Sequence, residues 1–125
     1  MSAATATWLT VCLGGALGGA LRYAVSGWIG RRIGETFPWG TLVVNASGAF
    51  AIGVLLGLLA RQALPAGVWS LLGVGVLGGY TTVSSLSLQT LLLARDGELP
   101  RAGAYLGLSL LSGLAAVVAG LMVGR

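Results

Sequence analysis

The chain has 125 residues, of which 56% are hydrophobic and only 8% are charged, and its mean hydropathy is +0.93. That composition excludes an ordinary soluble domain and predicts an all-α membrane protein. The net charge of +4 comes from seven arginines scattered at the ends of apolar stretches, so it indicates topology signals and interfacial anchors rather than a nucleic-acid-binding stripe.

Charged residues divide the chain into four uncharged stretches, each long enough for the roughly 20 apolar residues that a membrane helix needs. We therefore predict one domain over residues 1–125, with four transmembrane helices joined by short loops. The predicted helices cover residues 5–28, 39–60, 67–94 and 101–124. Short connections make each helix antiparallel to the next.

The first predicted helix, residues 5–28, carries glycines spaced by four, such as Gly14 with Gly18. This spacing leaves one helix face without side chains and is typical of tight packing between membrane helices. Arg22 lies late in the helix, where it can snorkel toward the nearby end or cap carbonyl groups of another helix. Cys12 is the single cysteine, so no internal disulfide can form, and we interpret it as a small packing residue.

The second predicted helix, residues 39–60, begins after Pro38, whose missing N–H costs little at a helix start. Thr41 and Asn45 lie four residues apart and therefore share a helix face. The side-chain amide of Asn45 cannot be satisfied by its own helix alone. It should reach either a partner helix or a permeating species, and the residues alone leave both open.

The third predicted helix, residues 67–94, is too long for one plain span, and it contains the adjacent glycines Gly78 and Gly79 followed by a run of hydroxyl side chains. Irregular backbone inside a membrane is tolerated only where protein or a water-filled path satisfies it. We therefore predict a break near Gly78 and Gly79, at a place where something polar is handled. The polar residues that share a face beyond the break are Thr82, Ser85 and Gln89.

The fourth predicted helix, residues 101–124, follows Pro100 and carries Ser109 and Ser112 on one face. No Asp, Glu, His or Lys lies inside any of the predicted spans. This absence argues against a proton-coupled pump, a metal transporter and an enzyme with an activated serine. What remains is a set of hydroxyl and amide donors, which can bind an anion without carrying charge themselves.

Three motifs in this chain resemble the CrcB/Fluc family of fluoride channels. They are GGALGGALRY at residues 14–23, PWGTLVVN at residues 38–45 (with Gly48 and Phe50 beyond it), and GGYTT at residues 78–82. Each motif alone is weak, but all three occur in the family's order. The resemblance covers all four helices and is specific for that reason.

The resemblance implies passive export of fluoride across a bacterial plasma membrane, which lowers its cytoplasmic concentration. It implies a dimer of antiparallel subunits in the lipid bilayer, built from two copies or from this chain and a homologous subunit. By motif position it also implies a structural, untransported Na⁺ held by the backbone carbonyls of Gly78 and Thr81. The implied pore residues are Asn45, Ser84, Tyr105 and Ser109. Nothing in this resemblance points to an enzyme.

Two pore positions depart from the family pattern, because Val83 and Leu86 stand where the family has phenylalanines. An aromatic edge is weakly positive and can face an anion, whereas Val and Leu offer no such edge. Gln89 also replaces a family glutamate, keeping hydrogen bonding and losing charge. The chain is then a channel that conducts through hydroxyls and amides, a half of a heterodimer whose partner supplies the phenylalanines, or a subunit that does not conduct.

A small four-helix multidrug exporter also fits the size and helix count. Such exporters resemble one another in carrying a membrane-embedded glutamate in the first helix, and this chain has none.

The loop arginines are shared unevenly between the two sides of the membrane. One side carries four, namely Arg31, Arg32, Arg95 and Arg101, and the other carries two, Arg61 and Arg125. By the positive-inside rule, this bias predicts that both termini lie outside. A subunit that inserts in both orientations should be nearly balanced, so the bias favours a fixed orientation and an oppositely oriented partner chain.

Overall fold

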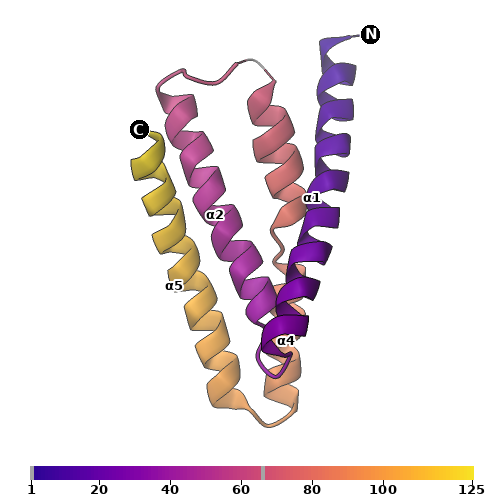
Figure 1. The fold of residues 1–125 in the computed structure, drawn as a ribbon, viewed down its shortest axis with the longest axis vertical. Helices are drawn as coiled ribbons and strands as arrows, with labels where there is room; N and C mark the ends of the chain where they lie inside the picture. Colours follow the sequence, from indigo (N-terminus) through magenta and orange to yellow (C-terminus); the bar gives the residue numbers. More distant parts are fainter. Residues whose placement is uncertain (1, 66) are drawn as a thin grey trace.

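The computed structural model describes residues 2–65 and 67–125, and these residues form helices and loops without a strand (Figure 1). Helix α1 spans Ala3–Ile33 and α2 spans Trp39–Ala60. The third span comprises the π-helix η1 (Trp69–Leu77), the single turn α3 (Gly78–Tyr80) and helix α4 (Ser84–Arg95). Helix α5 spans Leu99–Gly124.

Four segments of the described chain are long and apolar enough to cross a bilayer, as predicted, and the protein is a multi-pass membrane protein. Helix α1 extends beyond the predicted 5–28 and ends where Gly34 adopts a φ of 101°. Glycine adopts this conformation without a Cβ penalty, and the Gly34 N–H donates to the Gly30 carbonyl at 2.9 Å. The helix therefore ends at the first glycine with a left-handed backbone and not at the end of the apolar run.

The third span is broken as predicted, but the interruption lies at residues 81–83 and not at Gly78 and Gly79 themselves. The two glycines stay helical, and Thr81 turns to extended backbone with φ −81° and ψ 157°. The break lies just beyond the two glycines because glycines permit a break without deciding which peptide opens. The half of the span before the break is π-helical, which no sequence pattern had indicated.

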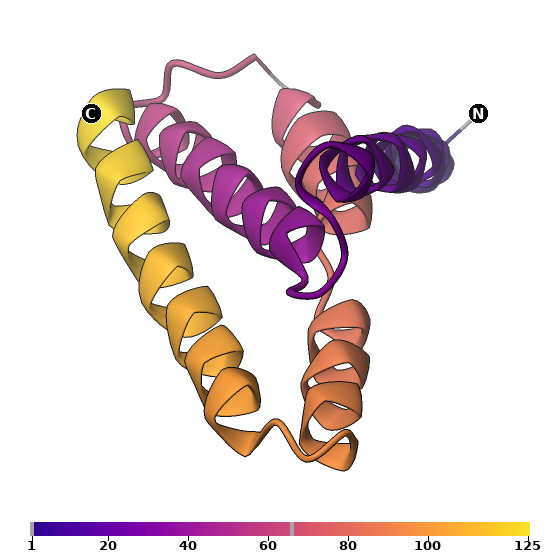
Figure 2. The same ribbon diagram turned by 60° about the horizontal axis from the view of Figure 1, so that its bottom comes forward.

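Two close helix pairs, α1 with η1 and α2 with α5, form the scaffold, and both pack through glycines (Figure 2). A Cβ on Gly14 would lie 2.7 Å from the Leu71 carbonyl oxygen, so the backbones of α1 and η1 touch there. Between α2 and α5, a Cβ on Gly57 would lie 2.8 Å from the backbone of Gly124. The four-residue spacing thus marks helix packing in these pairs. It does not at Gly103 of α5, where nothing lies within 4 Å.

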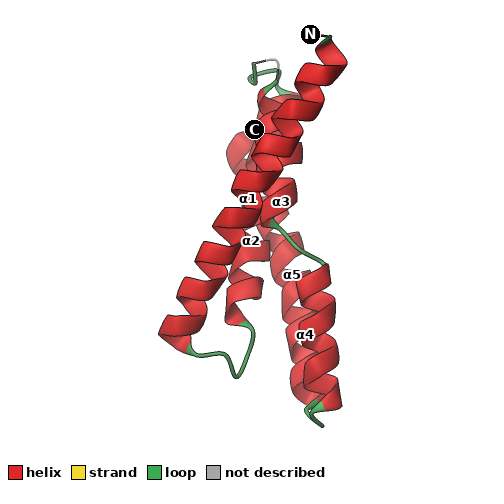
Figure 3. Cartoon of the chain, turned by 90° about the vertical axis from the view of Figure 1, so that its right-hand side faces the viewer, coloured by secondary structure: helices red, strands yellow, loops and turns green. Residues whose placement is uncertain are grey.

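At the end of the molecule away from both termini, the helices splay into two arms (Figure 3). One arm ends in the α1–α2 connection, residues 34–38, and the other ends in the α4–α5 connection, residues 96–98. A small core joins Phe37 of the α1–α2 connection to Leu93, Ala102 and Tyr105 of the second arm. Many other large apolar side chains are exposed, as expected for a surface that contacts lipid or a second subunit.

Candidate functional site

The broken span is tied to α2 by a two-point pairing between one side chain and one residue's backbone. Asn45 Nδ2 donates to the Thr82 carbonyl oxygen at 2.8 Å, and the Thr82 N–H donates to Asn45 Oδ1, also at 2.8 Å. Of the two partners expected for Asn45, the described structure thus supplies the partner helix. The second N–H of Nδ2 is not used in this pairing and remains available as a donor.

In the same region, two backbone carbonyl groups lack the hydrogen bonds that they would accept in a continuous helix. In an α-helix, the Thr82 N–H would donate to the Gly78 carbonyl and the Ser85 N–H to the Thr81 carbonyl. Here the Thr82 N–H donates to Asn45 instead, and the Ser85 N–H donates to Thr82 Oγ1 at 3.1 Å. The carbonyls of Gly78 and Thr81 thereby lose their helical donors.

Three hydroxyl groups gather at the start of α4. Thr82 Oγ1 lies 3.1 Å from Ser84 Oγ and 3.3 Å from Ser85 Oγ, and Thr82 is only 8% exposed. A hydroxyl group can rotate its proton toward an anion when one is present. The Thr81 hydroxyl is not part of this group. It donates to the Leu77 carbonyl of its own helix at 2.9 Å, so its proton is already used.

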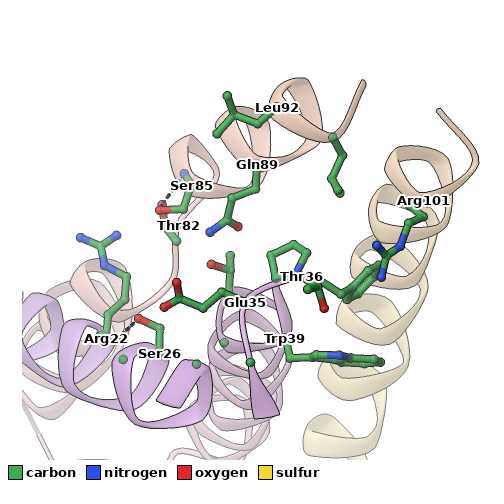
Figure 4. A pocket seen from close by; sticks show the side chains of 18 of the residues that line it. Arg22, Ser26, Glu35, Thr36, Trp39, Thr82, Ser85, Gln89, Leu92 and Arg101 are labelled. Atoms are coloured by element: carbon green, nitrogen blue, oxygen red, sulfur yellow. Dashed lines mark hydrogen bonds between the residues drawn. The ribbon is translucent and has the colours of Figure 1, made fainter. Parts of the chain in front are cut away.

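Two hollows in the structure are both lined by Thr82. A cavity of about 850 Å³ opens between the two arms, and its lining includes Thr41, Ser85 and Gln89 (Figure 4). A smaller groove of about 520 Å³ is lined mainly by apolar side chains, together with Asn45. Uncharged donors therefore lie in the walls of both hollows, and Thr82 belongs to both.

Six of the predicted site residues come together along the smaller groove. They are Asn45, Gly78, Thr81, Val83, Leu86 and Ser109. Val83 is 75% exposed, so its side of the groove is uncovered in a single chain. The hydroxyl of Ser109 is buried without a hydrogen-bond partner among residues 2–65 and 67–125. Ser84, a further predicted residue, joins the group through the Thr82 hydroxyl.

Tyr105 lies apart from this groove, in the wall of the second arm. Its side chain is fully buried and meets the Phe37 ring edge-on, with ring centroids 5.5 Å apart. Its hydroxyl donates to Gln89 Oε1 at 2.7 Å, which fixes a side chain that lines the larger cavity. In this chain Tyr105 therefore reaches the cavity through Gln89.

Two buried threonines belong to the site although the sequence placed them only on polar helix faces. Thr41 is 6% and Thr82 is 8% exposed, and both line the larger cavity. The available signal for Thr82 was its position three residues before Ser85, the spacing at which a hydroxyl caps a helix start. No sequence pattern indicated that Glu35, in the α1–α2 connection, also lines this cavity.

Comparisons with known proteins place these features in a family. The family model described as "CrcB-like protein, Camphor Resistance (CrcB)" matches residues 9–121. The chain is 53% identical over 124 residues to the fluoride-specific ion channel FluC 2 of Rhodopseudomonas palustris, covering 94% of this chain and 92% of the relative. It is 47% identical to the fluoride-specific ion channel FluC of Thermus thermophilus, with the same coverage of 94% and 92%. A fluoride-specific ion channel FluC 4 of Brucella abortus is 54% identical over 72% of this chain and 70% of its own length.

Proposed function

This chain belongs to the CrcB-like protein family, and we propose that it is a subunit of a fluoride-specific ion channel through which fluoride leaves a bacterial cell passively. The observation that carries the proposal is that Thr82 lines both hollows, beside the uncharged donors Ser85 and Gln89 in one and Asn45 and Ser109 in the other. A small anion can exchange its water for such donors. The family is a channel family and not an enzyme class. Membership in it favours a channel over the small multidrug exporter, which only the size and helix count supported.

The proposed path uses the donors in the order in which they line the hollows. Thr41, Ser85 and Gln89 receive fluoride from the larger cavity, and the Thr82 hydroxyl passes it inward. The free N–H of Asn45 and the unpartnered hydroxyl of Ser109 take it over in the groove. Neutral donors suit this task because a conducting site must bind the ion well enough to admit it and weakly enough to release it.

We also propose that a second subunit, inserted in the opposite orientation, covers the groove. Support comes from the exposed face of Val83 and from the Ser109 hydroxyl, which has no partner within the described chain. Counting of photobleaching steps on singly labelled, reconstituted protein should give two steps per particle. One step per particle would contradict the dimer.

We further propose a structural Na⁺ at the same face of the protein. The carbonyls of Gly78 and Thr81 have lost their helical donors, and carbonyl oxygens are ligands that a hard cation accepts. Within the described chain no cluster of three His, Cys, Asp or Glu side chains offers a competing site. The ion would supply positive charge between the two subunits. Replacing Na⁺ by N-methylglucamine should therefore lower the thermal stability of the dimer, and unchanged stability would contradict the site.

The function is tested by fluoride efflux from liposomes that contain only this protein. A fluoride-selective electrode should record rapid release of trapped fluoride once an ionophore balances the charge, while trapped chloride stays inside. Release at the rate of protein-free liposomes, or equal release of both halides, would contradict a fluoride channel made from this chain alone.

A partner-dependent channel is the second candidate, and two observations favour it. The loop arginines divide four against two between the membrane sides, and Val83 and Leu86 offer the groove no aromatic edge. This candidate predicts that liposomes with this chain alone release no fluoride. Co-reconstitution with a homologous subunit that carries the phenylalanines should then give efflux. Full activity of the single chain would exclude it.

A further inference from the structure

The residues at which the third span opens contact α2 one at a time. Thr82 is held by the two-point pairing with Asn45. Tyr80 is the last residue of α3, and its hydroxyl lies 3.1 Å from Ser47 Oγ. Because the one proton of the Ser47 hydroxyl goes to the Val44 carbonyl, Tyr80 is the donor of this bond. Ser47 thus anchors the helical residue that directly precedes the break.

Thr81, the residue between these two contacts, lies against Gly48 of α2. A Cβ on Gly48 would collide with Thr81 Cγ2 and would lie 3.2 Å from Tyr80 Cδ2. The Thr81 hydroxyl donates to the Leu77 carbonyl at 2.9 Å, and the chirality of threonine fixes Cγ2 once Oγ1 is placed. Glycine weakens a helix interior relative to alanine, so a buried glycine in α2 calls for a packing reason. The methyl group of Thr81 supplies that reason.

These contacts decide in which direction the Asn45 side chain can donate. Its Oδ1 and one Nδ2 proton bond to the backbone of Thr82 at 2.8 Å each. A carboxamide is planar, so once these two bonds are made the direction of the second Nδ2 proton is fixed. The Thr82 backbone in turn follows the two residues that precede it, and Asn45 and Gly48 line the same groove.

We propose that Ser47 and Gly48 are positioning residues of the fluoride path. By holding the two residues before Thr82, they set the direction of the free Nδ2 proton of Asn45 in the groove. The proposal rests on the proposed function and adds two residues to its site. Both act through Asn45, and neither needs to contact the ion.

The positioning can be measured without any conduction, because Asn45 is the only asparagine of the chain. Protein labelled with ¹⁵N-asparagine and held in nanodiscs gives one pair of side-chain N–H resonances. We expect Gly48→Ala to remove the downfield proton shift that the bond to Thr82 causes. Gly53→Ala is the matched control, since its Cβ would collide with the Val117 carbonyl of α5 and not with the break. An unchanged resonance pair in Gly48→Ala overturns the role of Gly48.

A second substitution tests whether the effect of Gly48→Ala comes from the Thr81 methyl group. Thr81→Ser keeps the hydroxyl that donates to Leu77 and removes the methyl group that the new Cβ would strike. The double variant Gly48→Ala/Thr81→Ser should therefore regain most of the downfield shift of the Asn45 proton. A double variant with the spectrum of Gly48→Ala would contradict the contact.

Tyr80→Phe tests the Ser47 contact with a milder change, which removes the hydroxyl and leaves the ring against Gly48. We expect fluoride efflux from liposomes to fall about two- to tenfold, the range that one neutral hydrogen bond corresponds to, together with a smaller shift of the Asn45 proton. Ser47→Ala removes the same bond from the other side and should match Tyr80→Phe. This pair decides the proposal even if Gly48→Ala does not fold.

The outcomes separate the positioning from the function. Wild-type resonances in both Tyr80→Phe and Ser47→Ala overturn the role of Ser47. Shifted resonances with wild-type efflux overturn the effect on the fluoride path. Efflux at background in every protein, the wild type included, contradicts the proposed function, while the Asn45 resonances still decide whether Ser47 and Gly48 position that side chain.

Discussion

At the scale of single residues, Asn45 shows how a polar side chain inside a membrane can be satisfied and still keep a donor for the proposed transport. Its Oδ1 and one Nδ2 proton pair with Thr82, at 2.8 Å each. An amide without partners in hydrocarbon would cost several kcal/mol, so this pairing explains how α2 can carry an asparagine inside the membrane. The second proton is what remains for an anion.

Asn45→Asp should abolish fluoride efflux, because an oxygen then replaces the Nδ2 donor and faces the Thr82 carbonyl. We expect the protein to lose about 1–3 kcal/mol of stability, the penalty for an unpaired buried group. Efflux from liposomes and thermal unfolding in detergent measure the two effects. Thr90→Val is the matched control, since the Thr90 hydroxyl donates only to the Leu86 carbonyl of its own helix. Full efflux in Asn45→Asp would show that the Asn45 donor is not part of the fluoride path.

Tyr105→Phe removes the 2.7 Å bond to Gln89 and keeps the ring against Phe37. We expect a loss of about 1 kcal/mol in stability, together with a reduced efflux rate because Gln89 is no longer fixed in the cavity lining. Tyr105→Ala also empties the core of the second arm and should cost about 3–5 kcal/mol. Thermal unfolding of both variants tests whether Tyr105→Phe loses less stability than Tyr105→Ala. Equal losses would contradict a separate role for the hydroxyl.

At the scale of helices, the number and the approximate extent of the spans followed from the sequence, because apolar length alone dictates them. The break could be predicted only roughly. Gly78 and Gly79 weaken the helix, but the peptide that opens is the one held by Asn45, a residue 37 positions away in the chain. No local pattern contains that contact. The clustering of Asn45, Thr82 and Ser109 around one groove has the same origin, since it needs three helices to meet.

The glycine contacts between α1 and the third span should be far less tolerant than the glycines of α5. A Cβ on Gly79 would collide with the backbone carbonyl of Gly15, whereas a Cβ on Gly103 meets nothing within 4 Å. Gly79→Ala should therefore destabilise the protein by about 1–3 kcal/mol, and Gly103→Ala should be neutral or slightly stabilising. Thermal unfolding of the two variants tests the difference, and equal behaviour would mean that the α1–α3 contact is loose.

At the scale of the whole molecule, two features of the single chain support the proposed second subunit. The apolar groove beside the break is uncovered, and the buried Ser109 hydroxyl lacks a partner within the described residues. The larger cavity, by contrast, is formed by one chain alone, from α1, the α1–α2 connection, α4, the α4–α5 connection and the starts of α2 and α5. The proposed second subunit would complete the inner part of the proposed path, whereas the residues of one chain form the mouth.

Neutral donors around a broken helix should carry fluoride passively and selectively if the proposed function is right. The most direct measurement is the reversal potential of the current through planar bilayers containing this protein, under separate gradients of fluoride, chloride and protons. We predict a reversal potential that moves by about 59 mV for each tenfold fluoride gradient, as for any ion of unit charge, and that ignores chloride and pH. A reversal potential that follows chloride or protons would contradict the account.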